Sequence, residues 1–551
     1  MKKRYLISSL LLLLCSCGGN ESSSNMMSNN SNNVSNSSLS SSTSSSNSSS
    51  VSGDIGPNQK EILDVLNREL ECVLNEDQTG YIVMKYKGYD PYIKLPDTFY
   101  GLYSSKKEVN GKEYDVYTGE KKFDENVLEL PIVGIMNGAF HSSGGVKDIY
   151  IPDSYEYFES DAFVGCTTIE NYFVSDNHKN YKSVDGVLYS KDGLSLFSYP
   201  YGRRSVYNVV DGTKNILSGA FKSSTVKEVI LPESIENIES YAFYMAKQLV
   251  KVNIPSKITE IKEFTFNTCA SLREVDFSEG LEVVGEYAFQ HCQLLNTFTF
   301  PSSLRELKTS SFEQITSIEH LVLNEGLEII GDFAFAYNEY IEEITFPSTL
   351  KTIGKYAFMQ NYRLKELKLV EGIQELQEGS FFYNTALTKV NIPASLHTIG
   401  FKSFSMSENG VEEYVVSENS NYFTTVDGIV YSKDLKELLL APITCNFTNG
   451  HYQVLDGVEK IGSHAFYNND SLKSITLPSS LKFIGKAPFY ITNLNKINYS
   501  GDIEDFKKIE AEDEIFTSST SNDTLIVKWY QTNDYAMVSI VTCNDGTYSF
   551  I

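Results

Sequence analysis

Positive charge is scarce in this sequence. Its 551 residues include 46 lysines and arginines against 71 aspartates and glutamates, so the formal charge at neutral pH is −25. Proteins that bind nucleic acid need clustered basic side chains to displace counterions from the phosphates. The only run of three basic residues is Lys2, Lys3 and Arg4. We therefore expect no nucleic-acid partner, and we interpret the acidic surface as an aid to solubility.

Patterns that carry catalysis or hold metal ions are also missing. No HExxH or GxSxG motif and no phosphate-binding glycine loop occurs. The seven histidines are spread along the chain without ligand spacing, at positions 141, 178, 291, 320, 397, 451 and 464. We predict that the protein is not an enzyme and holds no metal ion and no cofactor. A catalytic pair assembled across repeats is the alternative.

Long hydrophobic runs are rare, and the run at the N-terminus is too short to span a bilayer as a permanent helix. Three basic residues precede YLISSLLLLL (5–14) and CSCGGN follows, which is the order of an export signal. Residues 14–17 resemble a bacterial lipobox. That resemblance implies a signal peptide of residues 1–16 and lipidation of Cys17; an ordinary secretory signal is the alternative. Residues 17–56, rich in serine and asparagine, are predicted to form a disordered tether.

Repetition dominates the rest of the chain. The segment PSTLKTIGKYAFMQNYRLKELKL (347–369) is followed by VEGIQELQEGSFFYNTALTKVNI, which keeps the same leucine and phenylalanine positions. A leucine-type position opens each strand, at Val146, Ile169, Val226, Leu249, Leu272, Leu295, Ile318, Ile341, Leu364, Leu387, Val411, Leu472 and Leu494. A phenylalanine ladder of the same period comprises Phe140, Phe163, Phe221, Phe243, Phe266, Phe289, Phe312, Phe335, Phe358, Phe381, Phe404, Phe466 and Phe489. Such a period predicts a solenoid.

Alternation within each repeat predicts a parallel β-sheet. In LKELKL (364–369), Leu367 and Leu369 are expected to face the core while Glu366 and Lys368 face solvent. Stacked repeats would bury one face of this sheet, so the fold class is a mostly β repeat solenoid. Glycines recur in one position of the repeat and are interpreted as turn residues, at Gly285, Gly331, Gly354 and Gly400.

The pattern Pro-Ser-x-Leu-x-x-Ile-Gly-x-x-Ala-Phe-x-x-x-x-x-Leu-x-x-Ile resembles the BspA-like leucine-rich repeats of bacterial surface proteins, over residues 81–500. Insertions are expected near 102–129, 175–215 and 417–456. The last two contain the similar segments YKSVDGVLYSKDGLSLFSYP and YFTTVDGIVYSKDLKELLLAP, which predict β-hairpins at the VDG turns. Residues 501–551 resemble the family's C-terminal cap and are expected to be α+β, with a hairpin turn at Asn544-Asp545-Gly546.

Residues 57–80 are predicted to form a capping helix. Their apolar positions recur with helical spacing, at Ile62, Val65, Leu66, Leu70, Val73 and Leu74. Such a helix would cover the exposed edge of the first repeat.

One small-residue position in the repeat accounts for three of the eight cysteines. It lies three residues after a ladder phenylalanine and holds Cys166, Cys269, Cys292, Asn338, Asn361, Asn384 and Asn469. A stacked row of small side chains explains this position better than a metal site at His291 and Cys292. We predict free thiols; a disulfide between Cys269 and Cys292 in an oxidising compartment is the alternative.

Solvent-facing strand positions form two rows, which are the candidate binding face. Lane 1 comprises Lys251, Glu274, Thr297, His320, Glu343, Glu366 and Lys389. Lane 2 comprises Asn253, Asp276, Thr299, Val322, Thr345, Lys368 and Asn391. These positions vary while the core positions stay apolar, although a solvated sheet needs no ligand. Aromatic side chains before the Ala-Phe pair, at Tyr241, Tyr287, Phe333 and Tyr356, form a second candidate surface but are expected mainly to pack between adjacent repeats.

The lipobox resemblance implies a lipid anchor. The resemblance to BspA-like proteins implies an adhesin on the bacterial cell surface, which binds proteins or glycans of host or bacterial surfaces. Contact with the membrane is expected through the lipid anchor only, and the protein is expected to be monomeric. The alternative is a nutrient-capture surface lipoprotein with a defined ligand site near an inserted hairpin. An envelope enzyme is the least favoured hypothesis, because repeat scaffolds usually bind.

Overall fold

The computed structural model describes residues 63–119, 127–141, 143–405, 410–445, 447–489, 492–512, 516–517, 526–527 and 540–549. These residues fall within one compact unit, Lys60–Ile551. The signal peptide, the lipidation of Cys17 and the tether of residues 17–56 lie outside the described ranges and stay predictions. Within the described ranges, no helix is both long enough and apolar enough to cross a membrane.

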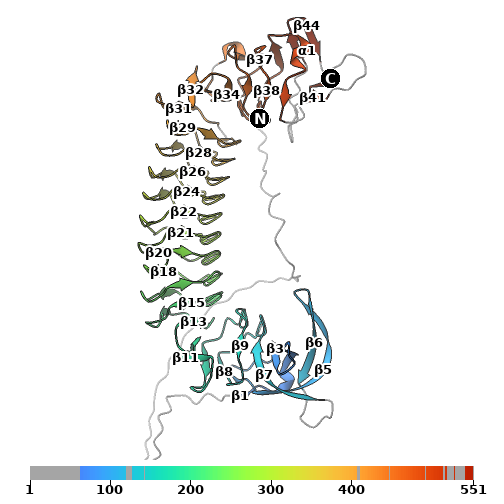
Figure 1. Ribbon diagram of the computed structural model, residues 1–551, viewed down its shortest axis with the longest axis vertical. Coiled ribbons are helices and arrows are strands. Elements are labelled where there is room, and N and C mark those ends of the chain that lie inside the picture. The colour runs from blue at the N-terminus through green and yellow to red at the C-terminus, as the bar shows by residue number, and fades with distance from the viewer. Residues whose placement is uncertain are drawn as a thin grey trace, which may run out of the picture. The chain divides into compact units, whose positions relative to one another are not determined.

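The repeats stack as a mostly β solenoid, so the predicted fold class is confirmed (Figure 1). The leucine-pattern strands form what we call the main sheet, in which a strand pairs in parallel with the strand one repeat later. Between β18 and β20, for example, Lys251 pairs with Glu274 and Ile254 with Phe277. The strands of the main sheet are β1 (Leu63–Asp64), β4 (Tyr92–Lys94), β8 (Asp148–Ile151), β10 (Asn171–Val174), β14 (Val206–Asn208), β16 (Glu228–Ile230), β18 (Lys251–Ile254), β20 (Glu274–Phe277), β23 (His320–Val322), β25 (Glu343–Thr345), β27 (Glu366–Lys368), β29 (Lys389–Ile392), β31 (Glu413–Val416), β35 (His451–Gln453), β37 (Ser474–Leu477), β39 (Lys496–Tyr499) and β43 (Ile540–Cys543).

A second parallel sheet, which the sequence pattern did not predict, forms where each repeat reads Ile-Gly. Most of its strands are two residues long: β15 (Asn215–Ile216), β17 (Asn237–Ile238), β19 (Glu260–Ile261), β21 (Val283–Val284), β22 (Glu306–Leu307), β24 (Ile329–Ile330), β26 (Thr352–Ile353), β28 (Glu375–Leu376), β30 (Thr398–Ile399), β36 (Lys460–Ile461), β38 (Phe483–Ile484) and β40 (Glu510–Ala511). The glycine that follows has another cause than the predicted turn. A Cβ on Gly354 would lie 2.6 Å from the carbonyl carbon of Gly331, so close approach of neighbouring backbones demands glycine.

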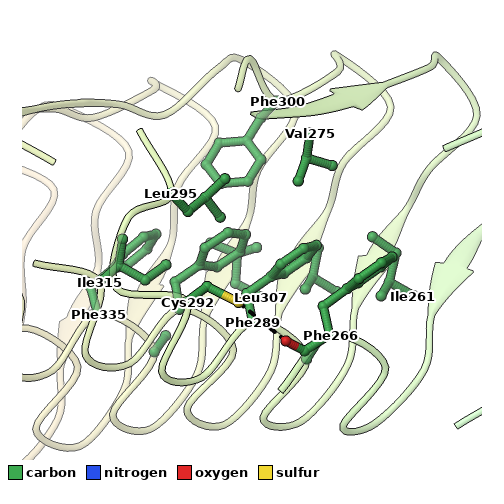
Figure 2. Packing of buried hydrophobic residues seen from close by; sticks show 14 of the residues in the cluster. Ile261, Phe266, Val275, Phe289, Cys292, Leu295, Phe300, Leu307, Ile315 and Phe335 are labelled. Atoms are coloured by element: carbon green, nitrogen blue, oxygen red, sulfur yellow. Dashed lines mark hydrogen bonds between the residues drawn. The ribbon is translucent and has the colours of Figure 1, made fainter. Parts of the chain in front are cut away.

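The phenylalanine ladder fills the core between the two sheets. Phe266 stacks on Phe243 and on Phe289 at ring-centroid distances of 4.8 and 5.1 Å, and all three rings are fully buried. Figure 2 shows Phe266 and Phe289 in line, with Val275 and Leu295 packed beside them. Stacked aromatic pairs contribute roughly 0.5–1.5 kcal/mol beyond their buried area. One Phe per repeat therefore links each repeat to both of its neighbours.

Beside the ladder, two residues per repeat adopt the left-handed conformation. In one repeat these are Tyr287 and His291, with φ values of 57° and 63°. The amides of Tyr287, Phe289 and His291 donate to carbonyls of the next repeat over 2.9, 2.8 and 3.0 Å. A non-glycine residue in this conformation costs roughly 1 kcal/mol, and the hydrogen bonds between repeats offset that cost. Tyr287 also stacks on Phe264 at 4.8 Å, which confirms the expectation that these aromatic residues pack between repeats.

The predicted N-terminal helix is wrong over its described part. Strand β2 (Leu70–Leu74) follows a 3-10 turn, η1 (Asn67–Glu69), and pairs with β3 (Tyr81–Tyr86) and β6 (Lys112–Gly119). Leu70 packs into one core, whereas Val73 packs with Val116 and Met136 on the other face. Burial on both faces of a strand gives apolar residues a spacing that mimics a helix. The rest of this sheet comprises β5 (Thr98–Val109), β7 (Leu128–Ile135) and β9 (Tyr157–Phe158).

Both VDG segments form hairpins, as predicted. The first comprises β11 (Tyr181–Val184), β12 (Val187–Ser190) and β13 (Ser195–Ser198); the second comprises β32 (Phe423–Val426), β33 (Ile429–Ser432) and β34 (Glu437–Leu440). In the first turn, Asp185 and Gly186 both have positive φ, 48° and 73°, as a two-residue hairpin turn requires.

At the C-terminal end, β43 pairs with β44 (Gly546–Ser549) across the predicted Asn544-Asp545-Gly546 turn. The short helix α1 (Ile503–Phe506) lies in the same region of the sequence. The remaining described elements are η2 (Thr448–Gly450), β41 (Phe516–Thr517) and β42 (Ile526–Val527).

Candidate functional site: the solvent face of the main sheet

The predicted lane residues lie on the solvent side of the main sheet. Between them along the strands stand Val252, Val275 and Leu321, which are buried. Lane residues are exposed or half-buried, and Val322, with 56% of its surface exposed, is the most exposed large apolar side chain among them. The alternation predicted from the sequence therefore places the variable residues on one accessible surface.

Strand register aligns many lane residues across repeats. Lys251 pairs with Glu274, which bridges to Thr297 in the following repeat. Further along, His320 pairs with Glu343. In the last part of the lanes, the pairs are Glu366 with Lys389 and Lys368 with Asn391.

The pairing is not continuous along the face. Thr297 makes an isolated bridge, and its neighbours up to residue 299 form no described strand. Strands β25 and β27 also belong to separate hydrogen-bonded groups. The predicted face therefore divides into three parts: residues 251–276, 320–345 and 366–391.

Charges on the face compensate one another locally. Lys251 Nζ lies 2.5 Å from a carboxylate oxygen of Glu274 and 3.2 Å from a carboxylate oxygen of Asp276. Both carboxylates raise the pKa of Lys251, and Glu274 has the larger effect. Lys389 lies 2.9 Å from Glu413 in the same way. Exposed pairs of this kind contribute little to stability. The fourteen residues carry three lysines and four carboxylates, a formal charge of −1 with His320 neutral, so bulk electrostatics does not select a partner here.

Asn253 has a second role in the structure. Its side-chain amide donates to the carbonyl of Leu231 and its oxygen accepts from the Leu231 amide, both over 2.8 Å. The side chain thus continues the main sheet where β16 has ended at Ile230. The Asn253 side chain is half-buried, and its amide is already hydrogen-bonded to Leu231. Less of this side chain is therefore available to contact a partner.

The same face continues beyond the predicted residues. On β8 and β10, Tyr150 and Phe173 occupy lane 2 positions and stack with a ring-centroid distance of 4.6 Å. Together with Lys94, Asp97 and Asp153 they line a shallow groove of about 440 Å³. These positions follow the leucine-type residues at 146 and 169 by four residues, so extending the lanes across the insertion near 175–215 would have found them.

The small-residue position has the structural role predicted for it. The thiol of Cys269 donates to the carbonyl of Phe243 at a sulfur–oxygen distance of 3.2 Å. The thiol of Cys292 donates to the carbonyl of Phe266 in the same way, at 3.1 Å (Figure 2). In later repeats, the Asn361 amide donates to the carbonyl of Phe335 over 3.2 Å. All six cysteines of the described residues are free thiols. The described residues also contain no group of His, Cys, Asp and Glu side chains that could hold a metal ion.

Parallel strands stacked at a 23-residue period around a phenylalanine ladder define a leucine-rich repeat solenoid. The family model described as the BspA type leucine-rich repeat region matches in six copies, at residues 118–185, 194–319, 282–411 and 444–535. The chain therefore belongs to the BspA-type leucine-rich repeat family of bacterial surface proteins, whose repeat scaffolds generally bind proteins. No curated protein sequence matches the chain significantly.

Several solved structures are similar to this chain. One is a leucine-rich repeat protein from Bacteroides ovatus, with 20% identity, a TM-score of 0.47 and coverage of 80% of this chain and 96% of that one. A leucine-rich repeat protein from Eubacterium ventriosum has 22% identity, a TM-score of 0.34 and coverage of 47% and 63%. A leucine rich cell surface protein from Faecalibacterium prausnitzii has 18% identity, a TM-score of 0.35 and coverage of 80% and 96%.

Proposed function

We propose that this protein is a surface adhesin that binds a protein partner through the two lanes of the main sheet. The single observation that carries the proposal is the mixed character of the accessible face: paired charges, hydroxyl groups and the exposed Val322 lie on the same solvent side of the main sheet, in register within each of its three parts. A face of formal charge close to zero suits contact by shape and hydrogen bonding, as protein interfaces use. The protein acts without catalysis and as a monomer.

The location of this function is the bacterial cell surface, with the solenoid held by a lipid on Cys17 and by the tether of residues 17–56. The basis is the residue order at the N-terminus, KKR followed by YLISSLLLLL and CSC. Metabolic labelling with a palmitate analogue tests this assignment. Label on the wild type and no label on Cys17→Ala is expected; equal labelling of both would refute lipidation at Cys17.

Binding of the purified protein to a panel of extracellular-matrix proteins and bacterial surfaces tests the adhesin. The test variant changes five lane residues to serine: Glu274, Asp276, Glu343, Glu366 and Lys368. A matched control has the same charge change on residues that directly precede second-sheet strands: Glu236, Glu282, Glu328, Lys351 and Glu459. Saturable binding that is lost only in the lane variant is expected. Equal loss in both variants, or in neither, would contradict recognition by the lanes.

Capture of a small nutrient is the second candidate function. The observation that favours it is a cavity beside the second inserted hairpin, between the repeat of Phe404 and the repeat of Phe466. Sequence reasoning placed the defined ligand site of a nutrient-capture protein near such a hairpin. The two functions do not exclude each other, because the cavity and the lanes use different residues.

A further inference from the structure

The two inserted hairpins are structural copies of one another. In both, the middle strand pairs with its neighbours on either side, and the ladder to the third strand shifts register at the matching residues, Leu188/Tyr189 and Val430/Tyr431. A hydrogen-bonded pair of tyrosine hydroxyls also recurs: Tyr189 with Tyr207 at 2.6 Å, which is buried, and Tyr431 with Tyr452 at 2.5 Å, which is partly buried. The two copies can therefore be compared residue by residue, and their differences show what each one encloses.

Aromatic rings fill the space beside the first hairpin. The ring centroid of Phe158, on β9, lies 5.9 Å from that of Phe197 on β13. The ring centroid of Tyr181 lies 4.8 Å from that of Phe158 and 5.3 Å from that of Phe197. Tyr201 completes this cluster and is 2% exposed. The repeat before the hairpin is therefore joined to it by a continuous packing of rings.

The second copy has smaller side chains at three of these positions. Counting from the shared ladder phenylalanine and from the shared VDG turn, the counterparts of Phe158, Phe197 and Tyr201 are Ile399, Leu439 and Ile443. All three line a cavity of about 220 Å³. A cavity of about 150 Å³ is enough to hold benzene, so the missing rings leave room for a ring-sized ligand.

An ion pair at the edge of the first copy is also changed in the second. Asp161 lies 2.6 Å from Lys222, which joins the repeats on either side of the hairpin. The first copy has Asp161 two residues before ladder Phe163, and the second copy has Lys402 two residues before Phe404. Lys222 follows ladder Phe221 in the first copy, and Tyr467 takes its place after Phe466 in the second. Lys402 lines the cavity, and its ammonium lies 4.7 Å from the ring centroid of Phe401. In the described part of the chain it forms no ion pair with a carboxylate, so a residue of the cavity wall carries a positive charge that no carboxylate neutralises.

The cavity wall also contains groups that could orient a ligand by hydrogen bonds. The hydroxyl of Tyr172 in the first copy accepts from Ser198 Oγ over 3.3 Å. Its counterpart Tyr414 lines the cavity together with Leu440, which replaces that serine, and within the described residues the Tyr414 hydroxyl makes no hydrogen bond. Burial raises the pKa of Tyr414, so the phenol is protonated at neutral pH and able to donate.

The electrostatic surroundings favour an anion. His464, whose Nδ1 is hydrogen-bonded to Ser405 Oγ at 2.8 Å, lines the same cavity. Burial, with further contributions from the positive charges of Lys402 and Lys486, lowers the pKa of His464 to about 4. The imidazole is therefore neutral at pH 7, and the wall carries positive charge that a bound anion would offset. Lys460, the other lysine of the wall, is already paired with Glu437 at 2.9 Å.

We infer that the cavity beside the second hairpin binds a small aromatic carboxylate. Its ring takes the space that Phe197 and Tyr201 fill in the first copy, and its carboxylate meets Lys402 where the first copy carries an acid. The hydroxyl of Tyr414 is positioned to donate to the ligand. This site goes beyond the adhesive function proposed for the main sheet, and the two stand or fall separately.

Calorimetric titration of the purified full chain with benzoate tests the site. Two variants restore the residues of the first copy: Leu439→Phe with Ile443→Tyr, which fills the cavity, and Lys402→Asp, which reverses its charge. The control is Lys433→Asp, an equal charge change at an exposed lysine that directly follows the hairpin strand β33. Benzyl alcohol and benzylamine replace the carboxylate by a neutral group and a cation.

Single-site binding of benzoate is expected in the wild type and in Lys433→Asp, with at least tenfold weaker binding in each restored variant and for benzyl alcohol and benzylamine. Failure of benzoate to bind the wild type at millimolar concentration would overturn the inference. Unchanged affinity in the filled variant would overturn the cavity as the site, and equal binding of benzyl alcohol would overturn the carboxylate. Lys402→Asp leaves the apolar packing intact, so it decides the question even if the filled variant does not fold.

Discussion

Removal of one buried amide from the small-residue row should cost more than removal of an entire exposed side chain. Asn384 is 1% exposed and connects two repeats. Its amide nitrogen donates to the carbonyls of Phe358 and Phe381 over 3.0 and 2.6 Å, and its oxygen accepts from the Asn361 amide over 3.0 Å. Asn384→Ala would leave these backbone groups without their partner in a site that water does not reach.

The expected magnitude follows from the number of groups left unsatisfied. A buried donor or acceptor without a partner costs roughly 1–3 kcal/mol. Two backbone groups, the Phe358 carbonyl and the Asn361 amide, lose their partner across the repeats, so we expect Asn384→Ala to lower the free energy of unfolding by about 3 kcal/mol. Asn384→Cys should lose about half as much, because the thiols of Cys269 and Cys292 donate to the equivalent carbonyl in their own repeats.

Urea unfolding followed by far-UV circular dichroism measures both effects, with Thr345→Ala on the solvent face as the control. The control should change the free energy of unfolding by less than about 0.5 kcal/mol, as exposed substitutions do. The dependence on urea must stay the same in all variants, since solenoids can also unfold in segments. If Asn384→Ala were no more destabilising than Thr345→Ala, the row of side chains would not join the repeats by hydrogen bonds.

Three further predictions address the core, the second sheet and His464 in the cavity wall. Phe335→Ala, which removes a fully buried ring stacked between Phe312 and Phe358 at 5.5 and 5.3 Å, should cost about 3–5 kcal/mol in urea unfolding without selective loss of partner binding; loss of binding at an unchanged melting temperature would contradict a purely structural role. Gly354→Ala should lower the melting temperature, because the new Cβ would meet backbone at 2.6 Å, and an unchanged melting temperature would show that neighbouring repeats can separate. The folded-state pKa of His464, about 4, lies below the unfolded value near 6.5. The unfolded chain therefore binds a proton at a higher pH than the folded protein. The contribution of neutral His464 to the free energy of unfolding is complete above pH 6.5 and falls toward pH 4, by about 2 kcal/mol at pH 5. The difference in unfolding free energy between wild type and His464→Gln, measured at pH 7 and pH 5, should change by that amount, and a difference independent of pH would refute the shift.

The repeating core could be predicted from residue order alone. Leu367 and Glu366 differ in burial because neighbouring residues of a strand point to opposite faces, and the same alternation recurs in most repeats. The cysteine and asparagine row was predictable for the same reason: Cys292 and Asn361 occupy one position of the repeat, and each donates to the carbonyl of a phenylalanine in the repeat before. A period repeated many times averages out the local ambiguities of a single segment.

The N-terminal sheet shows where this averaging fails. Residues 63–80 occur once, and Leu70, Val73 and Leu74 have the spacing of a helix. Only the pairing of β2 with β3 and β6, and the burial of Val73 on the opposite face from Leu70, make this segment a strand. Local propensity differs little between the two outcomes, so contacts with residues 81–119 decide.

The candidate sites divide in the same way. The sequence by itself determined the solenoid, the buried ladder and the two lanes, because these depend on period and on alternation within a strand. Tertiary structure alone decided which lane charges pair, that Asn253 binds the backbone of Leu231, and that a cavity opens beside the second hairpin. Those features depend on distances between residues of different repeats, and on the volumes of side chains brought together from residues 399, 439 and 443, which no local pattern records.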